Sequence, residues 1–213
     1  MKVAVIILNW NGKKLLERFL PSVVAFSKGY DIYVADNGSA DDSIAFVKKK
    51  YPQIHIVKLV ENFGYAEGYN KAVKDINADV FCFLNSDVKV TNDWINPVVK
   101  VFETQPEISI IQPKILDENK PHKFEYAGAA GGFIDQLGYP YCRGRIFETV
   151  EEDLGQYDSN CPLFWASGAC FFIRSKVFDD LNGFDAKFFA HMEEIDLCWR
   201  AHHMGHKLSL IHI

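Results

Sequence analysis

Hydrophobic residues in the first half of the chain form short continuous runs that alternate with runs spaced three or four residues apart. Val3 to Leu8 is a continuous apolar run with the length of a buried strand. Residues 13–26 carry apolar side chains at helical spacing, with Pro21 as a position that can kink the helix. Further strands are predicted at 31–35, 54–59, 80–84 and 108–112, and further helices at 39–51, 66–76 and 91–104, the last capped by Thr91. This alternation predicts an α/β fold, with a mostly parallel sheet flanked by helices on both faces.

The second half of the chain is less regular. Residues 117–160 carry many glycines among aromatic residues and show no sustained period, which is typical of functional or partly disordered loops. A strand is predicted at 164–173, and helices at 175–181 and 193–204. These later elements have too little core of their own, so we expect a single domain over residues 1–213. Residues 208–213 read as the start of a strand, and we therefore expect the sequence to be a piece of a longer protein.

Composition narrows the class of protein. Hydrophobic residues make up 48% and charged residues 24%, which is ordinary for a globular protein and excludes a disordered or fibrous chain. The net charge is 23 − 28 = -5, so we expect no nucleic-acid partner. The apolar runs are too short to cross a bilayer, and Met1 leads directly into a strand, so we expect a cytoplasmic protein. Five cysteines without a C-x-x-C pair are expected to be reduced thiols.

Polar residues follow each of the first four predicted strands. Ligands of open parallel sheets bind at the carboxyl ends of the strands, so these exits are where a site is expected. The exits are Asn9–Gly12, Asp36–Ser39, residues 62–70 and Asn85–Asp87. One such exit is ordinarily a turn, whereas four on one edge of a sheet predict a binding site.

The residue types at these exits suit a nucleotide and a metal ion. The Asp36 carboxylate can accept hydrogen bonds from a base or a ribose. Gly64 and Gly68 allow close backbone approach, and the Asn70 amide both donates and accepts. Asp87 is a hard oxygen ligand for Mg²⁺ or Mn²⁺. The glycine-rich phosphate loops of nucleotide hydrolases and dinucleotide dehydrogenases are missing from the sequence, so a diphosphate would be neutralised mainly by metal.

The last predicted helix begins with two adjacent glutamates. Glu193 and Glu194 have two interpretations, either a well-formed helix start on a solvated face or a general base facing the site. The helix dipole opposes a raised pKa, so the sequence predicts an ionised base and not an acid. Trp165, Ser167 and Gly168 open the strand predicted before this helix and are candidates to line an acceptor pocket.

In this order and spacing, the motifs resemble the nucleotide-sugar-dependent glycosyltransferases of family 2, whose fold is called GT-A. The likeness is greatest to the subgroup that includes rhamnosyltransferases of cell-surface polysaccharide assembly. The residues that carry the resemblance are 5–12, 34–39, 62–70, 83–88, 167–170 and 193–200. The resemblance implies a nucleotide-sugar-binding half at 1–115 and an acceptor-side half at 116–213. It also implies inverting transfer of a sugar from a UDP, dTDP or GDP donor to a hydroxyl of a saccharide or lipid-linked acceptor.

The resemblance also implies a role for each residue. Asp36 would contact the nucleobase with Asn9 close by, Asn85 would contact ribose or an ordered water, and Asp87 would coordinate Mg²⁺ or Mn²⁺. The nucleotide side would be completed by Asn37, Gly64, Gly68 and Asn70. Glu194 occupies the position of the family's usual base, where relatives carry Asp. Because Glu is one methylene longer, the choice between Glu193 and Glu194 stays open.

Family members usually carry a later His that completes the metal site, and C-terminal helices that help to bind acceptors. The sequence ends at Ile213, before that His, so we expect weak nucleotide-sugar binding and poor turnover from this chain. For the full-length enzyme the resemblance implies peripheral association with the inner face of the membrane. Two alternatives stay open. One is a non-catalytic or truncated nucleotide-sugar-binding module, and the other is a nucleotidyltransferase, for which residues 9–14 are a poor basic glycine loop.

Overall fold

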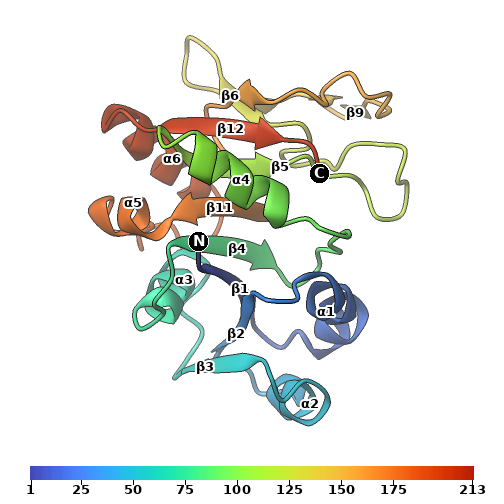
Figure 1. The fold of residues 1–213 in the computed structure, drawn as a ribbon, viewed down its shortest axis with the longest axis vertical. Coiled ribbons are helices and arrows are strands. Elements are labelled where there is room, and N and C mark those ends of the chain that lie inside the picture. The colour runs from blue at the N-terminus through green and yellow to red at the C-terminus, as the bar shows by residue number, and fades with distance from the viewer.

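An eight-stranded sheet with helices on both faces forms the centre of the computed structural model, which describes residues 1–213 (Figure 1). The strands of this sheet are β1 (Val3–Asn9), β2 (Asp31–Asn37), β3 (His55–Leu59), β4 (Val80–Asn85), β5 (Ile108–Pro113), β10 (Cys161–Pro162), β11 (Cys170–Arg174) and β12 (Lys207–Ile211). The helices are α1 (Lys13–Phe26), α2 (Ser43–Lys50), α3 (Ala66–Val73), α4 (Asn96–Thr104), α5 (Ser175–Asp180) and α6 (Glu193–His203).

The strand order is β10-β12-β5-β11-β4-β1-β2-β3, and most neighbouring pairs are parallel. The exception in the middle is β11, which runs antiparallel between β4 and β5. In the parallel register Asn9 pairs with Asp36, and Leu8 pairs with Asn85. The polar ends of β1, β2 and β4 therefore meet at one edge of the sheet. The predicted α/β class and mostly parallel sheet are confirmed.

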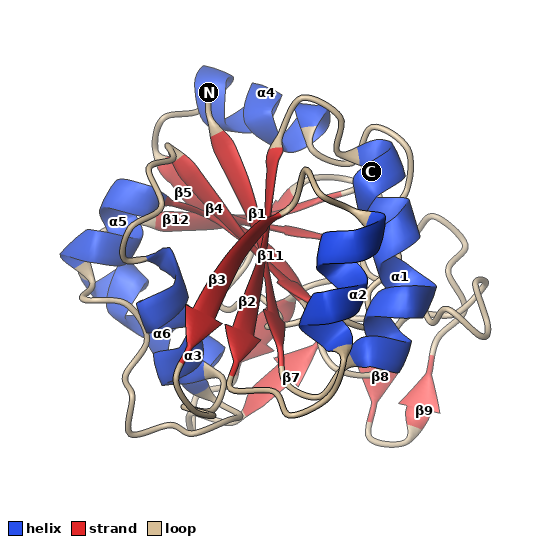
Figure 2. Ribbon diagram, turned by 90° about the horizontal axis from the view of Figure 1, so that it is seen from below, coloured by secondary structure: helices blue, strands red, loops and turns tan.

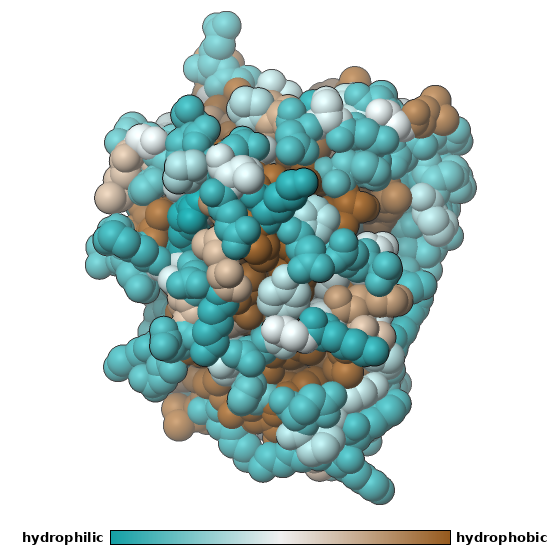
Figure 3. Space-filling model, viewed as in Figure 1, coloured by the Kyte–Doolittle hydropathy of each residue, from teal (hydrophilic) through white to brown (hydrophobic).

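Two hydrophobic layers hold the helices to the sheet. Helices α1, α2 and α4 cover one face, and α3, α5 and α6 cover the other (Figure 2). Each layer contains about as many buried residues as the other, 25 and 26. Because both faces are covered, β1, β4 and β5 are buried almost throughout, which explains their continuous apolar sequences. The surface over α4 is largely hydrophilic, with hydrophobic side chains visible between polar ones (Figure 3).

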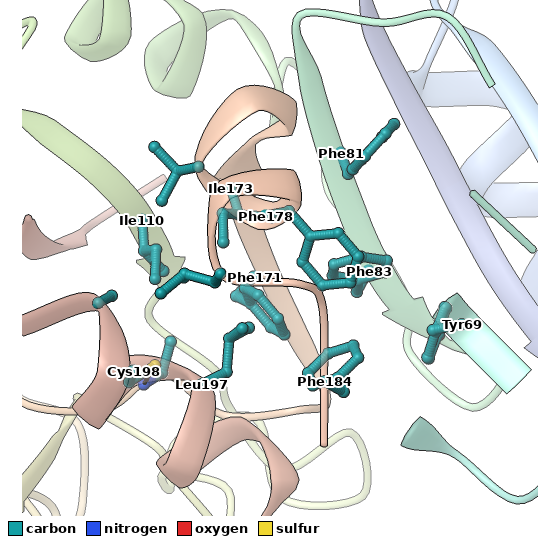
Figure 4. Close-up of a cluster of buried hydrophobic side chains, with 14 of the residues drawn as sticks. Tyr69, Phe81, Phe83, Ile110, Phe171, Ile173, Phe178, Phe184, Leu197 and Cys198 are labelled. Carbon is teal, nitrogen blue, oxygen red and sulfur yellow. Dashed lines mark hydrogen bonds between the residues drawn. The ribbon is translucent and has the colours of Figure 1, made fainter. Parts of the chain in front are cut away.

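Aromatic side chains form a cluster within the layer beneath α3 and α5 (Figure 4). The ring of Phe83 on β4 lies 4.7 Å from Tyr69, 5.1 Å from Phe178 and 5.2 Å from Phe171, measured between centroids. Phe184, in the turn after α5, packs on the same cluster at 5.4 Å from Phe83. Such tilted and edge-on pairs add to the hydrophobic gain of burial. They fix the segment that leads from β11 to α6, and hence the position of the first turn of α6.

Two helix starts differ from the prediction. The helix expected from Thr91 begins at Asn96, with Pro97 in its first turn, because residues 92–93 form a turn in which Asp93 adopts a left-handed φ of 58°. Helix α2 begins at Ser43 and not at Ser39. The Ser39 hydroxyl instead accepts hydrogen bonds from the Asn9 side chain (3.1 Å) and the Asn11 backbone (2.9 Å), so it is not available as a cap.

The later elements are partly as predicted. The strand expected at 164–173 is confined to β11, since residues 164–169 form a loop, and α3 ends at Val73 and not at 76. The irregular stretch 117–160 contains two small hairpins, β6 (Gly132–Ile134) with β7 (Pro140–Cys142) and β8 (Arg145–Ile146) with β9 (Thr149–Val150). The strand predicted near the end is β12. All five cysteines are free, and the structure contains no helix with the length and hydrophobicity to span a bilayer.

Candidate functional site

A cavity of about 670 Å³ lies at the carboxyl ends of β4 and β5. The loop before β11 and the first turn of α6 form its other walls. The predicted site residues that line it are Asn85, Asp87, Ser167, Gly168, Glu193 and Glu194. Residues from both halves of the chain therefore line one cavity.

The predicted residues of β1 and β2 lie outside this lining, at the neighbouring strand ends. Asn9 is fully buried, its amide donates to Ser39 Oγ and to Ser43 Oγ (2.9 Å), and its Oδ1 has no hydrogen-bond partner. Asp36 is 8% exposed and accepts one hydrogen bond from the Ser39 backbone (3.3 Å). Both residues therefore have an acceptor oxygen that can take a further hydrogen bond. Trp165 also lies outside the lining, since its indole is buried and donates to the Phe133 carbonyl (2.8 Å).

The amides of Asn37 and Asn70 have protein partners. Asn37 Nδ2 donates to the Gly64 carbonyl (2.9 Å), and its Oδ1 accepts from the Phe63 backbone (3.0 Å). Asn70 both donates to and accepts from the backbone of Phe184, at 2.8 and 2.9 Å. These bonds organise the loop before α3 and the turn before α6. A nucleotide-binding role for either residue stays a prediction.

Gly64 and Gly68 allow close approach, and here the approaching groups belong to the protein. Gly64 has a φ of 74°, and a Cβ placed on it would lie 2.5 Å from the Phe189 carbonyl oxygen. A Cβ on Gly68 would lie 3.0 Å from both Asn37 Nδ2 and a Leu8 methyl. The packing of the loop before α3 therefore accounts for both glycines. Their contact with a nucleotide stays a prediction.

Glu193 and Glu194 open α6 after two non-glycine residues in the left-handed region, His191 (φ 73°) and Met192 (φ 72°). Such a turn is costly, and it is typical of functional sites. It directs both carboxylates to the cavity, where the Oε2 atom of each is buried without a hydrogen-bond partner. Unpaired buried oxygens of this kind are rare in proteins and are expected where a ligand supplies the partner.

The electrostatics of the pair differ from the sequence expectation. Burial, and then the neighbouring charge of Glu194, raise the pKa of Glu193 to about 7. Burial also raises the pKa of Glu194, against the opposing effects of His191 and of the Gly168 backbone N–H. The expected opposition of the helix dipole to a raised pKa does not prevail, because desolvation raises the pKa of both carboxylates. That one of them acts as an ionised base stays a prediction. A carboxylate with a raised pKa is a stronger base.

A second acidic group lies on the Asp87 side of the cavity. Glu125 lines the cavity, and burial raises its pKa, with the charge of Asp87 adding to the effect.

No cluster of three His, Cys, Asp or Glu side chains is assembled here to hold a metal ion. Mg²⁺ and Mn²⁺ are commonly held by one or two carboxylates together with substrate phosphates. Asp87 therefore fits a metal ion whose coordination the substrate completes. Sequence reasoning missed Glu125, which lies in the aperiodic stretch.

Sequence reasoning also missed Gln112, at the end of β5. Its side chain is fully buried, donates to the Gly128 carbonyl and accepts from the Ser167 backbone, both at 2.8 Å. The Ser167 hydroxyl in turn donates to the Ala127 carbonyl (2.7 Å). Gln112 therefore holds the loop that carries Ser167 against the segment around Gly128. The available signal for this role was a glutamine in a strand that has only one other polar residue, Ser109.

The sequence is similar to those of known glycosyltransferases. The sequence model described as "Glycosyl transferase family 2" matches residues 4–181. The chain is 26% identical over 201 residues to the N-acetylglucosaminyl-diphospho-decaprenol L-rhamnosyltransferase of Mycobacterium tuberculosis, covering 85% of this chain and 64% of that protein. The chain thus spans about two thirds of that relative's length.

Solved structures with this fold are GT-A glycosyltransferases. GalNAc-T7 with UDP, GalNAc and Mn²⁺ superposes with a TM-score of 0.77 at 16% identity, over 99% of this chain and 41% of that chain. The mannosyltransferase PcManGT from Pyrobaculum calidifontis, in complex with GDP-Man and Mn²⁺, has a TM-score of 0.68 at 14% identity, over 100% and 54%. These likenesses confirm the predicted GT-A fold.

Proposed function

Since the chain belongs to glycosyl transferase family 2, we propose that it transfers a sugar from a nucleoside diphosphate donor to a hydroxyl of a saccharide or lipid-linked acceptor. The observation that carries this proposal is the pair Glu193 and Glu194, whose unpartnered carboxylate oxygens line the same cavity as Asp87. The similar rhamnosyltransferase, named for a diphospho-decaprenol acceptor, supports cell-surface glycan assembly as the setting.

The donor side is proposed at the ends of β1, β2 and β4. The unpaired Asn9 Oδ1 and the Asp36 carboxylate suit the N–H groups of a nucleobase, and Asn85, which lines the cavity, would contact the ribose. Asp87 would hold Mg²⁺ or Mn²⁺, which supplies charge neutralisation for the departing diphosphate. The Mn²⁺ in two structures of the same fold supports a divalent ion.

We assign the base to Glu194. Its own backbone N–H, His191 and the Gly168 N–H favour the charged form of Glu194, whereas only its own backbone N–H opposes the raised pKa of about 7 at Glu193. Glu193 therefore keeps the proton of the pair near neutral pH, and Glu194 takes the proton of the acceptor hydroxyl. The acceptor oxygen bonds to the anomeric carbon as the carbon–diphosphate bond breaks, with the electron pair leaving on the diphosphate. The acceptor oxygen attacks the face of the sugar opposite the diphosphate, and the configuration at the anomeric carbon is therefore inverted.

The wall formed by Ser167 and Gly168 is proposed to contact the acceptor. Both residues line the cavity beside Glu194, and a Cβ on Gly168 would lie 3.8 Å from the Glu194 carboxyl carbon. A side chain at 168 would therefore occupy the space in which an acceptor hydroxyl meets the base. Trp165 supports this wall through packing, because it is buried.

Calorimetric titration tests the donor site. UDP, dTDP and GDP are titrated with and without Mn²⁺ into the chain and into Asp87→Ala. Binding of one nucleotide that depends on Mn²⁺ and is lost in the variant supports the proposal. Binding that is equal with and without Mn²⁺ in both proteins contradicts the role of Asp87. Nucleotide binding with no transfer from any UDP-, dTDP- or GDP-hexose to an N-acetylglucosaminyl-diphospho-lipid would indicate a non-catalytic binding module.

A further inference from the structure

Tyr65 contacts both acceptor-side segments that flank the proposed base. It precedes α3, at the end of the loop that follows β3, and it is one of the residues that line the cavity. Its backbone N–H donates to the Phe189 carbonyl (2.7 Å), and its hydroxyl donates to the Gly168 carbonyl (2.7 Å). One residue of the donor-side half thus binds the loop before β11 and the loop before α6.

These contacts lead directly to Glu194. A Cβ on Gly168 would lie 3.1 Å from the Tyr65 hydroxyl oxygen and 3.8 Å from the Glu194 carboxyl carbon. Gly168 is therefore packed against both Tyr65 and Glu194. The Gly168 backbone N–H is also one of the groups that favour the charged form of Glu194. A shift of the Gly168 main chain would therefore change the surroundings of the Glu194 carboxylate.

The ring of Tyr65 is held firmly from the other side. Its centroid lies 4.7 Å from that of Tyr69 and 5.8 Å from that of Phe184, both members of the buried aromatic layer. Burial raises the pKa of the Tyr65 hydroxyl well above its usual range, so the group stays protonated and remains a donor. The hydroxyl is therefore a fixed anchor for Gly168, and it has no need to take part in proton transfer.

We infer that Tyr65 is a positioning residue, which sets the Gly168 wall and the Phe189 loop so that the Glu194 carboxylate faces the acceptor hydroxyl. This role rests on the glycosyl transfer proposed above. The loop before α3, which carries Tyr65, is hydrogen-bonded through its Gly64 carbonyl to Asn37 at the end of β2, next to Asp36. Tyr65 thus links the expected nucleobase side of the site to the base.

The test compares Tyr65→Phe with Tyr69→Phe in the intact chain. Both variants keep their ring and lose one hydroxyl. The hydroxyl of Tyr69 donates to the Leu84 carbonyl (3.1 Å) and accepts from the Leu8 backbone N–H (3.4 Å), and the hydrogen bond to the Gly168 carbonyl belongs to Tyr65. Loss of one neutral hydrogen bond should lower kcat about fivefold to tenfold in Tyr65→Phe, with the dissociation constant of the bound nucleotide unchanged. Tyr69→Phe should lower Tm and leave kcat near that of the unsubstituted chain.

Equal kcat in Tyr65→Phe and the unsubstituted chain, or equal losses in the two variants, would overturn the positioning role. Amide hydrogen exchange at residues 167–169 gives a readout that needs no activity, and Tyr65→Phe should accelerate it where Tyr69→Phe does not. Unchanged exchange in Tyr65→Phe contradicts the contact itself. Accelerated exchange in a chain that transfers no sugar supports the contact and contradicts the proposed function.

Discussion

Glu193 and Glu194 stand side by side in the first turn of α6, and the carboxylate of each has one buried oxygen without a hydrogen-bond partner. Two adjacent carboxylates removed from water retain a proton more readily than either would in solution. The cavity in front of them also contains Asp87, which comes from the end of β4. The chemistry expected of the protein follows from this arrangement, because a base with a raised pKa faces the place where a metal-bound donor is expected.

The rate of transfer should fall as the pH falls through the pKa of Glu194. Burial raises that pKa above the ordinary value of 4.5, and protonation removes the base. The acid limb of a kcat profile should therefore lie above pH 4.5. A rate that stays constant down to pH 4.5 would contradict Glu194 as the base.

Glu193→Gln should change how stability depends on pH. The folded-state pKa of Glu193, about 7, exceeds its ordinary value of 4.5, so its contribution is fully present below pH 4.5 and is lost as the pH rises through 7. Because glutamine does not ionise, the variant does not lose stability at position 193 as the pH rises. Its free energy of unfolding, relative to the unsubstituted chain, should rise by about 3 kcal/mol between pH 4.5 and pH 8.5.

Urea unfolding across this pH range checks the expectation for Glu193. Glu17→Gln, on the exposed side of α1, serves as the matched control and should show no such change. A difference between Glu193→Gln and the unsubstituted chain that is independent of pH would mean that Glu193 titrates normally.

Gln112→Leu should destabilise the chain by about 1–3 kcal/mol, because it leaves the Ser167 N–H buried without a partner and removes one of the two hydrogen bonds to the Gly128 carbonyl, which keeps the one from the Gly131 N–H. Gln53→Leu is the matched control, since Gln53 is exposed and its replacement should shift the free energy of unfolding by less than about 0.5 kcal/mol. Equal effects of the two substitutions in urea unfolding would show that Gln112 does not support the cavity wall.

Gly64→Ala and Gly29→Ala separate backbone strain from a steric clash. Both glycines have a positive φ, 74° and 89°, but a Cβ has no atom within 4 Å at Gly29 and meets the Phe189 carbonyl at Gly64. Gly29→Ala should cost about 1 kcal/mol through strain, and Gly64→Ala should cost at least about 2 kcal/mol more. Thermal unfolding measures both. Similar losses would contradict tight contact between the loop before α3 and Phe189.

Sequence reasoning predicted those parts of the structure that local pattern determines. The apolar runs of β1, β4 and β5 identified a parallel sheet, and the rule that ligands bind at strand ends was enough to identify Asn85 and Asp87 as cavity residues. The helix start expected at Thr91 was wrong because a turn with a left-handed Asp93 precedes α4. A turn of this kind has a weak local signal.

The missed residues act across long sequence separations. The Tyr65 hydroxyl reaches Gly168 across 103 positions, and Gln112 reaches Ser167 across 55. Neither pairing has a period or spacing that a single sequence shows. The raised pKa of Glu193 was missed for the same reason, since desolvation depends on which distant segments cover the carboxylate.

Transfer by Glu194→Gln, compared with Glu193→Gln and the unsubstituted chain, tests the assignment of the base most directly. Each protein is given the UDP-, dTDP- and GDP-hexose donors with Mn²⁺ and the lipid-linked acceptor, and nucleotide affinity is measured in parallel. Glu194→Gln should lose about 10²-fold to 10⁴-fold in kcat while keeping its nucleotide affinity, with a smaller loss in Glu193→Gln. A Glu194→Gln variant that transfers sugar at the rate of the unsubstituted chain would contradict the assignment.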